Sequence, residues 1–441
     1  MNRTSLKHVT PVALMCTFFL INGCGDSSNN VAVAPQTPEP PVLPVTITSF
    51  GPNAVSVWNE VAANTINIPA AATGTPEERQ PNYSVDLATI HVAIYDAVIA
   101  ISGTHKPYAI TPTTVAAGAS MDAAVSAAAY NVLRGLFPAR SSVYQATFDS
   151  LLLVIPEGDA KTRGIALGAE VARGVLALRA NDGRDVSLAV YVPGTAPGKF
   201  RGVNPIGRSN SNIKPFALTS AAQFRAPGPP ALDSAAYVTD FNESKSMGAA
   251  VNSMRSSAQT EVARFHTEPP PRFWPRNARQ FATNSQNLAD NARLMALIWI
   301  AQADATIACF DSKYFFEFWR PISAIVLADG DGNLATAADA TWAPVVPTPN
   351  HPEYPAAHSC VSTATAEVVR GFFRTDQISF KLDSTVADTV VHSFTSTGEF
   401  VNEIQAARIH GGMHFRTATV HGAAIGSNVA KLILDNHFLR R

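Results

Sequence analysis

Apolar residues at helical spacing, interrupted by proline and glycine, are the feature that most restricts the fold of this chain. They recur three and four positions apart in eight long segments. Pro138, Pro156 and the pair Asp182-Gly183 supply end signals between them. No persistent alternation of apolar and polar residues predicts a strand. The sequence therefore predicts an all-α, multi-helix bundle. Its helices are expected at residues 87–102, 121–137, 143–154, 160–181, 284–308, 361–373, 393–408 and 418–437.

The size and charge of the chain narrow its class. Its 441 residues, 46% of them hydrophobic, suffice for a large core in one domain or in two packed halves. The formal net charge of −1 gives no reason to expect nucleic acid as a partner. We expect a helical scaffold at 48–185, a loop-rich segment at 186–270 and a second helical half at 271–441.

The first residues have the composition of a targeting segment. Arg3 and Lys7 precede an apolar stretch at 12–21 that is too short to span a membrane. The stretch leads into Cys24 within a sequence similar to a bacterial lipoprotein cleavage box. We expect a signal peptide at 1–24 with Cys24 lipidated, and the alternative is cleavage without a lipid. Residues 25–47 are expected to form a proline-rich tether, which places the protein at the periplasmic face of a bacterial envelope, lipid-anchored or secreted.

Two cysteines remain beyond this segment, in a compartment where disulfides form. Cys309 lies about one helical turn before Lys313, and Cys360 lies two residues after His358. The sequence leaves open whether they form a disulfide or two buried thiols.

A first cluster of cations lies in the second half. Lys313 and Arg320 are seven residues apart in a predicted helix at 305–319, which places them within ~20° on one helical face. Pro321 is predicted to end that helix. A solvated basic stripe is the alternative, but the aromatic residues between the two cations make an exposed face improbable.

Two further clusters add histidines. His358 follows Pro355-Ala356-Ala357 and precedes a predicted helix, so it is expected near a helix N-terminus, where an anion is favoured. Arg408 and His414 are six residues apart, and Gly411-Gly412 between them can bend the backbone toward one ligand. Nearby His410 is expected to pack or to form a supporting hydrogen bond. Together the clusters offer three cations and two imidazoles, which suit a tetrahedral oxyanion.

In order and spacing, these motifs resemble the vanadium-dependent haloperoxidases and the related type 2 phosphatidic acid phosphatases. The segments at 88–98 and 271–274 also resemble the bacterial haloperoxidase-like group. The resemblance covers roughly residues 50 to 437. It implies the helical bundle of the haloperoxidase and acid phosphatase type, with vanadate as cofactor and hydrogen peroxide, halide and a small organic acceptor as partners. It leaves a homo-oligomer open.

The resemblance also implies a role for each matching residue. Lys313, Arg320 and Arg408 would bind the oxygens of the anion, with a bond from the backbone N–H of Ala357. His414 would bond to vanadium, and His358 would be the acid–base residue. His351, seven residues before His358, matches a position that is histidine in bromoperoxidases and aromatic in a chloroperoxidase. This favours iodide or bromide over chloride.

The chain departs from the family pattern at three positions. Ala356 replaces a serine whose hydroxyl would bond to the anion, Ala418 replaces an aspartate four residues after His414, and Ala407 replaces a serine. Three alternative functions are therefore compatible with this site. The first is a vanadate-dependent haloperoxidase, the second an acid phosphatase acting through a phosphohistidine at His414, and the third a non-catalytic oxyanion-binding lipoprotein.

Overall fold

The structure is a computed structural model that describes residues 43–67, 82–386 and 390–441. The expected signal peptide, Cys24 and most of the expected tether lie outside these residues. The end of the expected tether is described and is not a free linker: Val45–Thr46 form strand β1, which pairs with a strand near residue 378.

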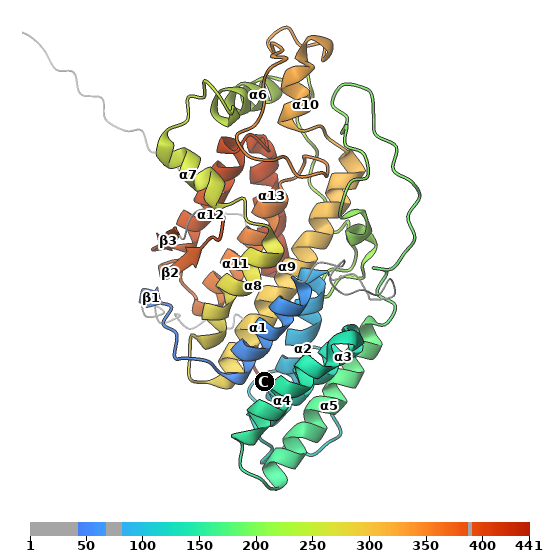
Figure 1. The fold of residues 1–441 in the computed structure, drawn as a ribbon, viewed down its shortest axis with the longest axis vertical. Coiled ribbons are helices and arrows are strands. Elements are labelled where there is room, and N and C mark those ends of the chain that lie inside the picture. Colours follow the sequence, from blue (N-terminus) through green and yellow to red (C-terminus); the bar gives the residue numbers. More distant parts are fainter. Residues whose placement is uncertain (1–42, 68–81, 387–389) are drawn as a thin grey trace, which may run out of the picture. The chain divides into compact units, whose positions relative to one another are not determined.

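The described residues form a bundle dominated by helices (Figure 1), so the predicted all-α class is confirmed. The helices are α1 (Ala54–Ile66), α2 (Tyr83–Ser102), α3 (Met121–Leu136), α4 (Ser141–Leu153), α5 (Asp159–Arg179), α6 (Ala235–Gly248), α7 (Ser257–Phe265), α8 (Pro270–Asn277), α9 (Leu288–Phe316), α10 (Pro321–Val326), α11 (Ala357–Phe373), α12 (Thr397–His410) and α13 (Arg416–Asn436). Local sequence sets several of their ends: Asn82 caps the start of α2, and Gly103 ends it with a φ of 65°.

Helices α2 and α9 form the centre of the core. Both are long and apolar enough to cross a membrane, but 89% of the apolar window of each is buried within the protein. A helix that is apolar on all sides needs partners all round. Accordingly α2 packs against α9 and α3, and α9 also packs against α11 and α13.

Small residues bring α11 and α13 close together. A Cβ atom at Gly426 would lie 2.4 Å from the carbonyl oxygen of Cys360, and one at Gly422 would lie 2.6 Å from that of Ala356. Such distances leave no room for a side chain. This contact fixes the start of α11, where Ala357 and His358 lie.

A small sheet corrects the expectation that the chain lacks strands. Strand β2 (Ile378–Asp383) lies between β1, to which it is parallel, and β3 (Val391–Phe394), to which it is antiparallel. In β2, Ile378, Phe380 and Leu382 are buried in alternation with more exposed residues. The strands are too short to change the fold class.

The segment between α5 and α6 runs mostly as loops, with one 3-10 helix at Arg208–Asn212. Asp304 of α9 anchors it, because its carboxylate accepts hydrogen bonds from the backbone N–H groups of Phe216, Ala217 and Leu218 at 2.7–2.9 Å. Asp311 forms an ion pair with Arg225 of the same segment at 2.7 Å. Both aspartates therefore hold the loop rather than the cations of the first cluster.

Candidate functional site

Lys313 and Arg320 do not share a helical face, so that prediction was wrong. Helix α9 ends at Phe316, and Glu317 adopts a left-handed conformation with a φ of 51°. Arg320 has extended backbone and precedes α10, so Pro321 begins a helix instead of ending one. Of the aromatic residues nearby, Phe318 and Trp319 are buried and Phe315 is exposed, so two of these three side chains belong to the core.

The two cations nevertheless bind the same loop. The Nζ of Lys313 donates to the carbonyl oxygens of Pro352, Glu353 and Pro355 at 2.8, 3.0 and 2.5 Å. The Nε of Arg320 donates to the carbonyl oxygen of His351 at 2.9 Å. Residues 351–355 thus bring the first two motifs together.

Arg320 also joins the first motif to the third. One of its terminal nitrogens lies 3.0 Å from Nε2 of His414 and donates to the carbonyl oxygen of Met413 at 2.9 Å. The other lies 3.0 Å from Nδ1 of His351. The convergence predicted from the three motifs is therefore present around this guanidinium.

The turn after α12 behaves as the glycine pair predicted. Gly412 has a φ of 76°, and a Cβ atom there would lie 2.6 Å from the carbonyl oxygen of Gly248. Arg408, in the last turn of α12, donates to the carbonyl oxygen of His266 at 2.8 Å. Its Nε is buried with no partner among the described residues. Nδ1 of His410 has no hydrogen-bond partner within the described part of the chain, so the imidazole gives these groups no hydrogen bond from that nitrogen.

His358 is the second residue of α11, which confirms its expected place at a helix N-terminus. Its Nε2 is buried and has no hydrogen-bond partner among the residues described. Burial, together with the charges of Arg408 and Arg320, holds the pKa of His358 well below its usual range. A neutral imidazole with an unpaired nitrogen is suited to exchange protons with a ligand.

Glu353 is a site residue that sequence reasoning missed. Its Oε1 lies 2.8 Å from Nδ1 of His414 and accepts from the backbone N–H of Phe415 at 3.0 Å. Burial raises the pKa of Glu353 to about 8, against the opposing effect of Arg320. The signal was an acidic residue inside a proline-bounded motif, where solvent exposure is not expected.

The two neighbours of His414 select one tautomer. A guanidinium can only donate, so Nε2 beside Arg320 must carry a lone pair. Nδ1 then carries the proton and donates it to Glu353. The nitrogen that a metal would need is therefore the one that faces the cations.

The site carries an excess of buried positive charge. The exposed fractions of Lys313, Arg320 and Arg408 are 0%, 2% and 1%. Burial lowers their pKa values to about 8, 10 and 9. Within the described residues, none of the three forms an ion pair with a carboxylate, and Glu353 pairs with His414. Because unpaired buried charges are costly, the arrangement favours an anion.

A pocket of about 770 Å³ leads to this region. His351, Ala357, His358 and Arg408 line it, whereas Lys313, Arg320 and His414 are not part of its lining. Much of the remaining wall is apolar and includes prolines at 269–271, 347 and 349, together with Phe310. The pocket can therefore admit a ligand with an apolar portion as well as small polar molecules.

The departures from the motif can also be placed. Ala356 is fully buried and is the residue before α11, with no side chain to cap the helix. Its N–H donates to the carbonyl oxygen of Ala418, which is also buried. Ala407 is fully buried in α12. Cys309 and Cys360 are both buried free thiols, which decides between the two alternatives for them.

Comparison with known proteins agrees with this geometry. The family model of the VCPO second helical-bundle domain matches residues 293–438, which contain the cations and histidines of the three motifs and Glu353. The vanadium chloroperoxidase of Curvularia inaequalis is 25% identical over 408 residues, a match that covers 74% of this chain and 66% of that protein. The chain thus spans just under two thirds of the length of that relative.

Solved structures show the same fold. One is the first bacterial vanadium-dependent iodoperoxidase, with a TM-score of 0.68 and 23% identity, covering 88% of this chain and 96% of the other. Another is a holo-type bacterial vanadium-dependent chloroperoxidase, with a TM-score of 0.66 and 16% identity, covering 87% and 97%. These likenesses show that residues 293–438 resemble the second helical-bundle domain of the vanadium chloroperoxidases and that the chain shares the fold of the bacterial vanadium haloperoxidases.

Proposed function

We propose that this protein is a vanadate-dependent haloperoxidase that oxidises iodide or bromide with hydrogen peroxide. The observation that carries the proposal is the state of His414: Glu353 holds its Nδ1, and its Nε2 lone pair faces Arg320 among buried cations that lack a counterion.

The residues fit vanadate as an anion. Arg320, Arg408 and Lys313 would bind its oxygens, with the backbone N–H of Ala357 at the start of α11 as a further donor. His414 would bond to the metal through Nε2. Arg408 has an unpaired Nε to offer, whereas Lys313 would exchange at least one of its carbonyl bonds for the anion. Bound vanadate would supply a Lewis acid that activates hydrogen peroxide without changing its own oxidation state.

His358 would move the proton. Its neutral imidazole lines the pocket, so its buried, unpaired Nε2 can accept a proton from incoming hydrogen peroxide. Once protonated, it lies at the N-terminus of α11, where a cation is disfavoured unless an anion is nearby. The proton would therefore be held only while the oxyanion site is loaded.

The choice of halide follows from His351, Ala356 and Ala418. His351 is buried and polar and bonds to Arg320 instead of forming a dry aromatic wall. The two alanines remove a hydroxyl and a carboxylate that would support the anion and His414. A weakly activated oxidant oxidises iodide most easily, bromide next and chloride least, so we place chloride outside the useful range. The apolar pocket would admit an organic acceptor for the oxidised halide.

The test is peroxide-dependent oxidation of iodide and bromide by the purified protein, with and without added vanadate. We expect activity that requires vanadate and is lost in His414→Ala. His410→Ala should keep the activity, because it removes a nearby imidazole whose Nδ1 has no hydrogen-bond partner among the described residues. Equal rates in wild type and His414→Ala would overturn the proposal. Hydrolysis of a phosphate ester by the vanadate-free protein, with phosphate trapped on His414, would support the phosphatase instead.

We also propose that Cys24, outside the described residues, anchors the protein to the bacterial envelope through a lipid. The support is the sequence pattern of the first 24 residues. Cys24→Ser should remove the protein from the detergent phase in a phase-partitioning experiment. Unchanged partitioning of this variant would contradict a lipid anchor.

A further inference from the structure

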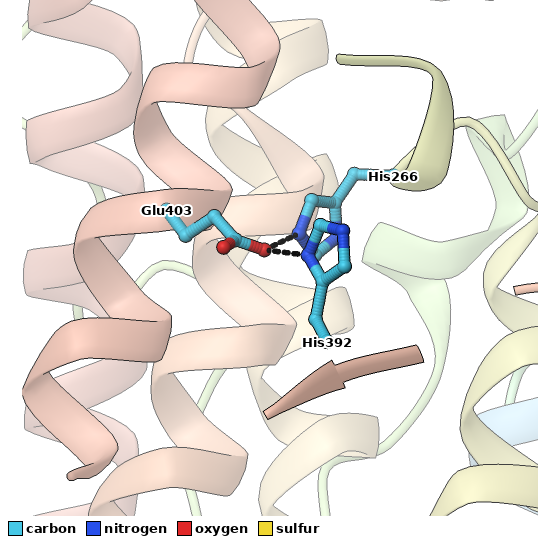
Figure 2. A group of neighbouring side chains, drawn as sticks. All are labelled: His266, His392 and Glu403. Atoms are coloured by element: carbon cyan, nitrogen blue, oxygen red, sulfur yellow. Dashed lines mark hydrogen bonds and ion pairs between the residues drawn. The ribbon is translucent and has the colours of Figure 1, made fainter. Parts of the chain in front are cut away.

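Two histidines and a glutamate meet beside α12, next to the oxyanion site but outside the group of residues that surrounds His414. They are His266, which directly follows α7, His392 of β3 and Glu403 of α12. Figure 2 shows both imidazole rings directed at the same carboxylate. Three elements far apart in sequence thus present potential metal ligands to one point.

The ligand atoms are close enough to share an ion. One nitrogen from each imidazole and one carboxylate oxygen all lie within 4.8 Å of one another. Nε2 of His266 is 2.8 Å and Nδ1 of His392 is 2.6 Å from Oε1 of Glu403. Ligands at about 2.0–2.1 Å from a tetrahedral zinc ion are separated by roughly 3.3 Å, so binding requires only a small opening of the cluster.

The surroundings also suit a metal site. The side chains of His266, His392 and Glu403 are 1%, 11% and 23% exposed, which combines shielding with access for an ion. The second nitrogen of His392 lies 3.1 Å from the carboxylate of Glu261. A carboxylate on the far nitrogen is the usual partner of a metal-bound imidazole, because it fixes the ring and increases its basicity.

We propose that His266 Nε2, His392 Nδ1 and the Glu403 carboxylate bind a divalent transition-metal ion of the zinc class, with Glu261 orienting His392. Two imidazoles and one carboxylate favour zinc and its neighbours over calcium or magnesium, which prefer oxygen ligands. Three protein ligands leave one position of a tetrahedral ion for water.

Protons compete with the proposed metal ion for the ligand atoms of this site. Without a metal, His392 lies between two carboxylates, whose charges raise its pKa against the effect of burial. The pKa of Glu403 is lowered to about 2 because the hydrogen bonds from both histidines outweigh burial. Metal binding would displace the proton on Nδ1 of His392, so affinity should fall as the pH is lowered.

The proposed ion would brace one wall of the oxyanion site. Glu403 and Arg408 lie on the same helix, five residues apart, and the carbonyl oxygen of His266 accepts a hydrogen bond from Arg408 at 2.8 Å. Two of the three ligands are thus connected to Arg408: His266 through this hydrogen bond, and Glu403 through the shared helix. The metal site itself depends only on the cluster and not on the proposed haloperoxidase activity.

The experiment uses the full chain, treated with a chelator, dialysed and then titrated with zinc chloride. Elemental analysis should find one tightly held zinc ion per chain, and thermal unfolding should shift to higher temperature with zinc. His392→Ala and Glu403→Gln should each weaken binding at least tenfold. His414→Ala, which removes an imidazole from the other site, should leave it unchanged.

Glu261→Gln keeps the test independent of folding. Glu261 is 40% exposed, so its replacement should be tolerated, and it should weaken zinc binding about tenfold through His392 alone. The proposal is overturned if wild type holds no more zinc than His392→Ala, or if His414→Ala removes the ion as effectively as the cluster variants.

Discussion

The carboxylate of Glu353 accepts a hydrogen bond from Nδ1 of His414 at 2.8 Å, and both side chains are only 1% exposed. This relationship assigns the proton to one nitrogen of the imidazole and leaves the other facing Arg320. The carboxylate that a family member would place four residues after the histidine is absent, since that position is Ala418. Glu353 supplies a carboxyl partner to the imidazole from a different loop, and because burial raises its pKa to about 8, that partner is anionic only above this pH.

We expect Glu353→Gln to weaken vanadate binding by roughly 10- to 100-fold while the protein stays folded. The amide oxygen can still accept from Nδ1, but an amide cannot ionise, whereas the carboxyl of Glu353 ionises above a pH of about 8 and then increases the basicity of His414. Equilibrium vanadate binding measures the change, and thermal unfolding is the control. Vanadate affinity equal to that of wild type would contradict a role for the charge of Glu353.

Ala356→Ser should stabilise the protein and tighten vanadate binding together. Ala356 precedes α11 with extended backbone, so a serine hydroxyl there can accept a bond from the N–H of Ser359, an effect of about 1 kcal/mol. The same hydroxyl lies beside the expected anion. Chemical denaturation and vanadate titration report the two effects separately, and a drop in the free energy of unfolding would show that the buried position rejects the hydroxyl.

The three histidines of the site should make the anion-free protein less stable as the pH falls below about 6.5. Burial and the neighbouring cations hold the pKa values of His351, His358 and His414 well below that of the unfolded chain. The unfolded chain then binds more protons than the folded protein, so stability is full above pH 6.5 and is lost below it. Each pKa unit corresponds to about 1.4 kcal/mol.

Other groups titrate in the opposite sense, because burial raises the pKa values of Asp96 and Asp304 to about 6. The measurement is therefore a comparison of thermal unfolding from pH 7 to pH 5 in wild type and His358→Asn. The variant should lose less stability, and 10 mM phosphate, a tetrahedral anion, should protect wild type. Identical profiles for the two proteins would contradict the assigned pKa of His358.

Initial rates at matched peroxide and pH should follow the order iodide, bromide, chloride, with little or no chloride oxidation. His351→Phe removes the ring nitrogen that lies 3.0 Å from Arg320 and makes the pocket drier, so the rate with bromide should rise relative to that with iodide. Chloride oxidation by wild type at a rate comparable to iodide would refute this interpretation of His351.

The helical fold could be predicted from the sequence because apolar residues recur at helical spacing over long segments, and such segments form buried helices. The end of α9 could not, since Glu317 adopts a left-handed conformation that non-glycine residues rarely take and no periodicity encodes. The sheet was missed although Ile378, Phe380 and Leu382 alternate, because six residues give too short a pattern to stand out.

The motifs identified the cations and histidines of the site, but not what holds them. The bond between Glu353 and His414 links residues 61 positions apart, and nothing in either local sequence specifies it. The cluster of His266, His392 and Glu403 is harder still, since it forms only when a helix end, a strand and another helix pack together. Tertiary contacts of this kind become visible only in three dimensions.

The close approach of Gly412 to Gly248 separates the backbone that positions His414 from the side chains that line the pocket. A Cβ atom at Gly248 would lie 2.4 Å from the Cα of Gly412, so two backbones in contact fix the turn that leads into His414. Residues such as His351 and Ala356 can then be exchanged while the frame that aims His414 stays in place. An engineer who wishes to alter the preferred substrate has freedom along the pocket wall, and almost none at these two glycines.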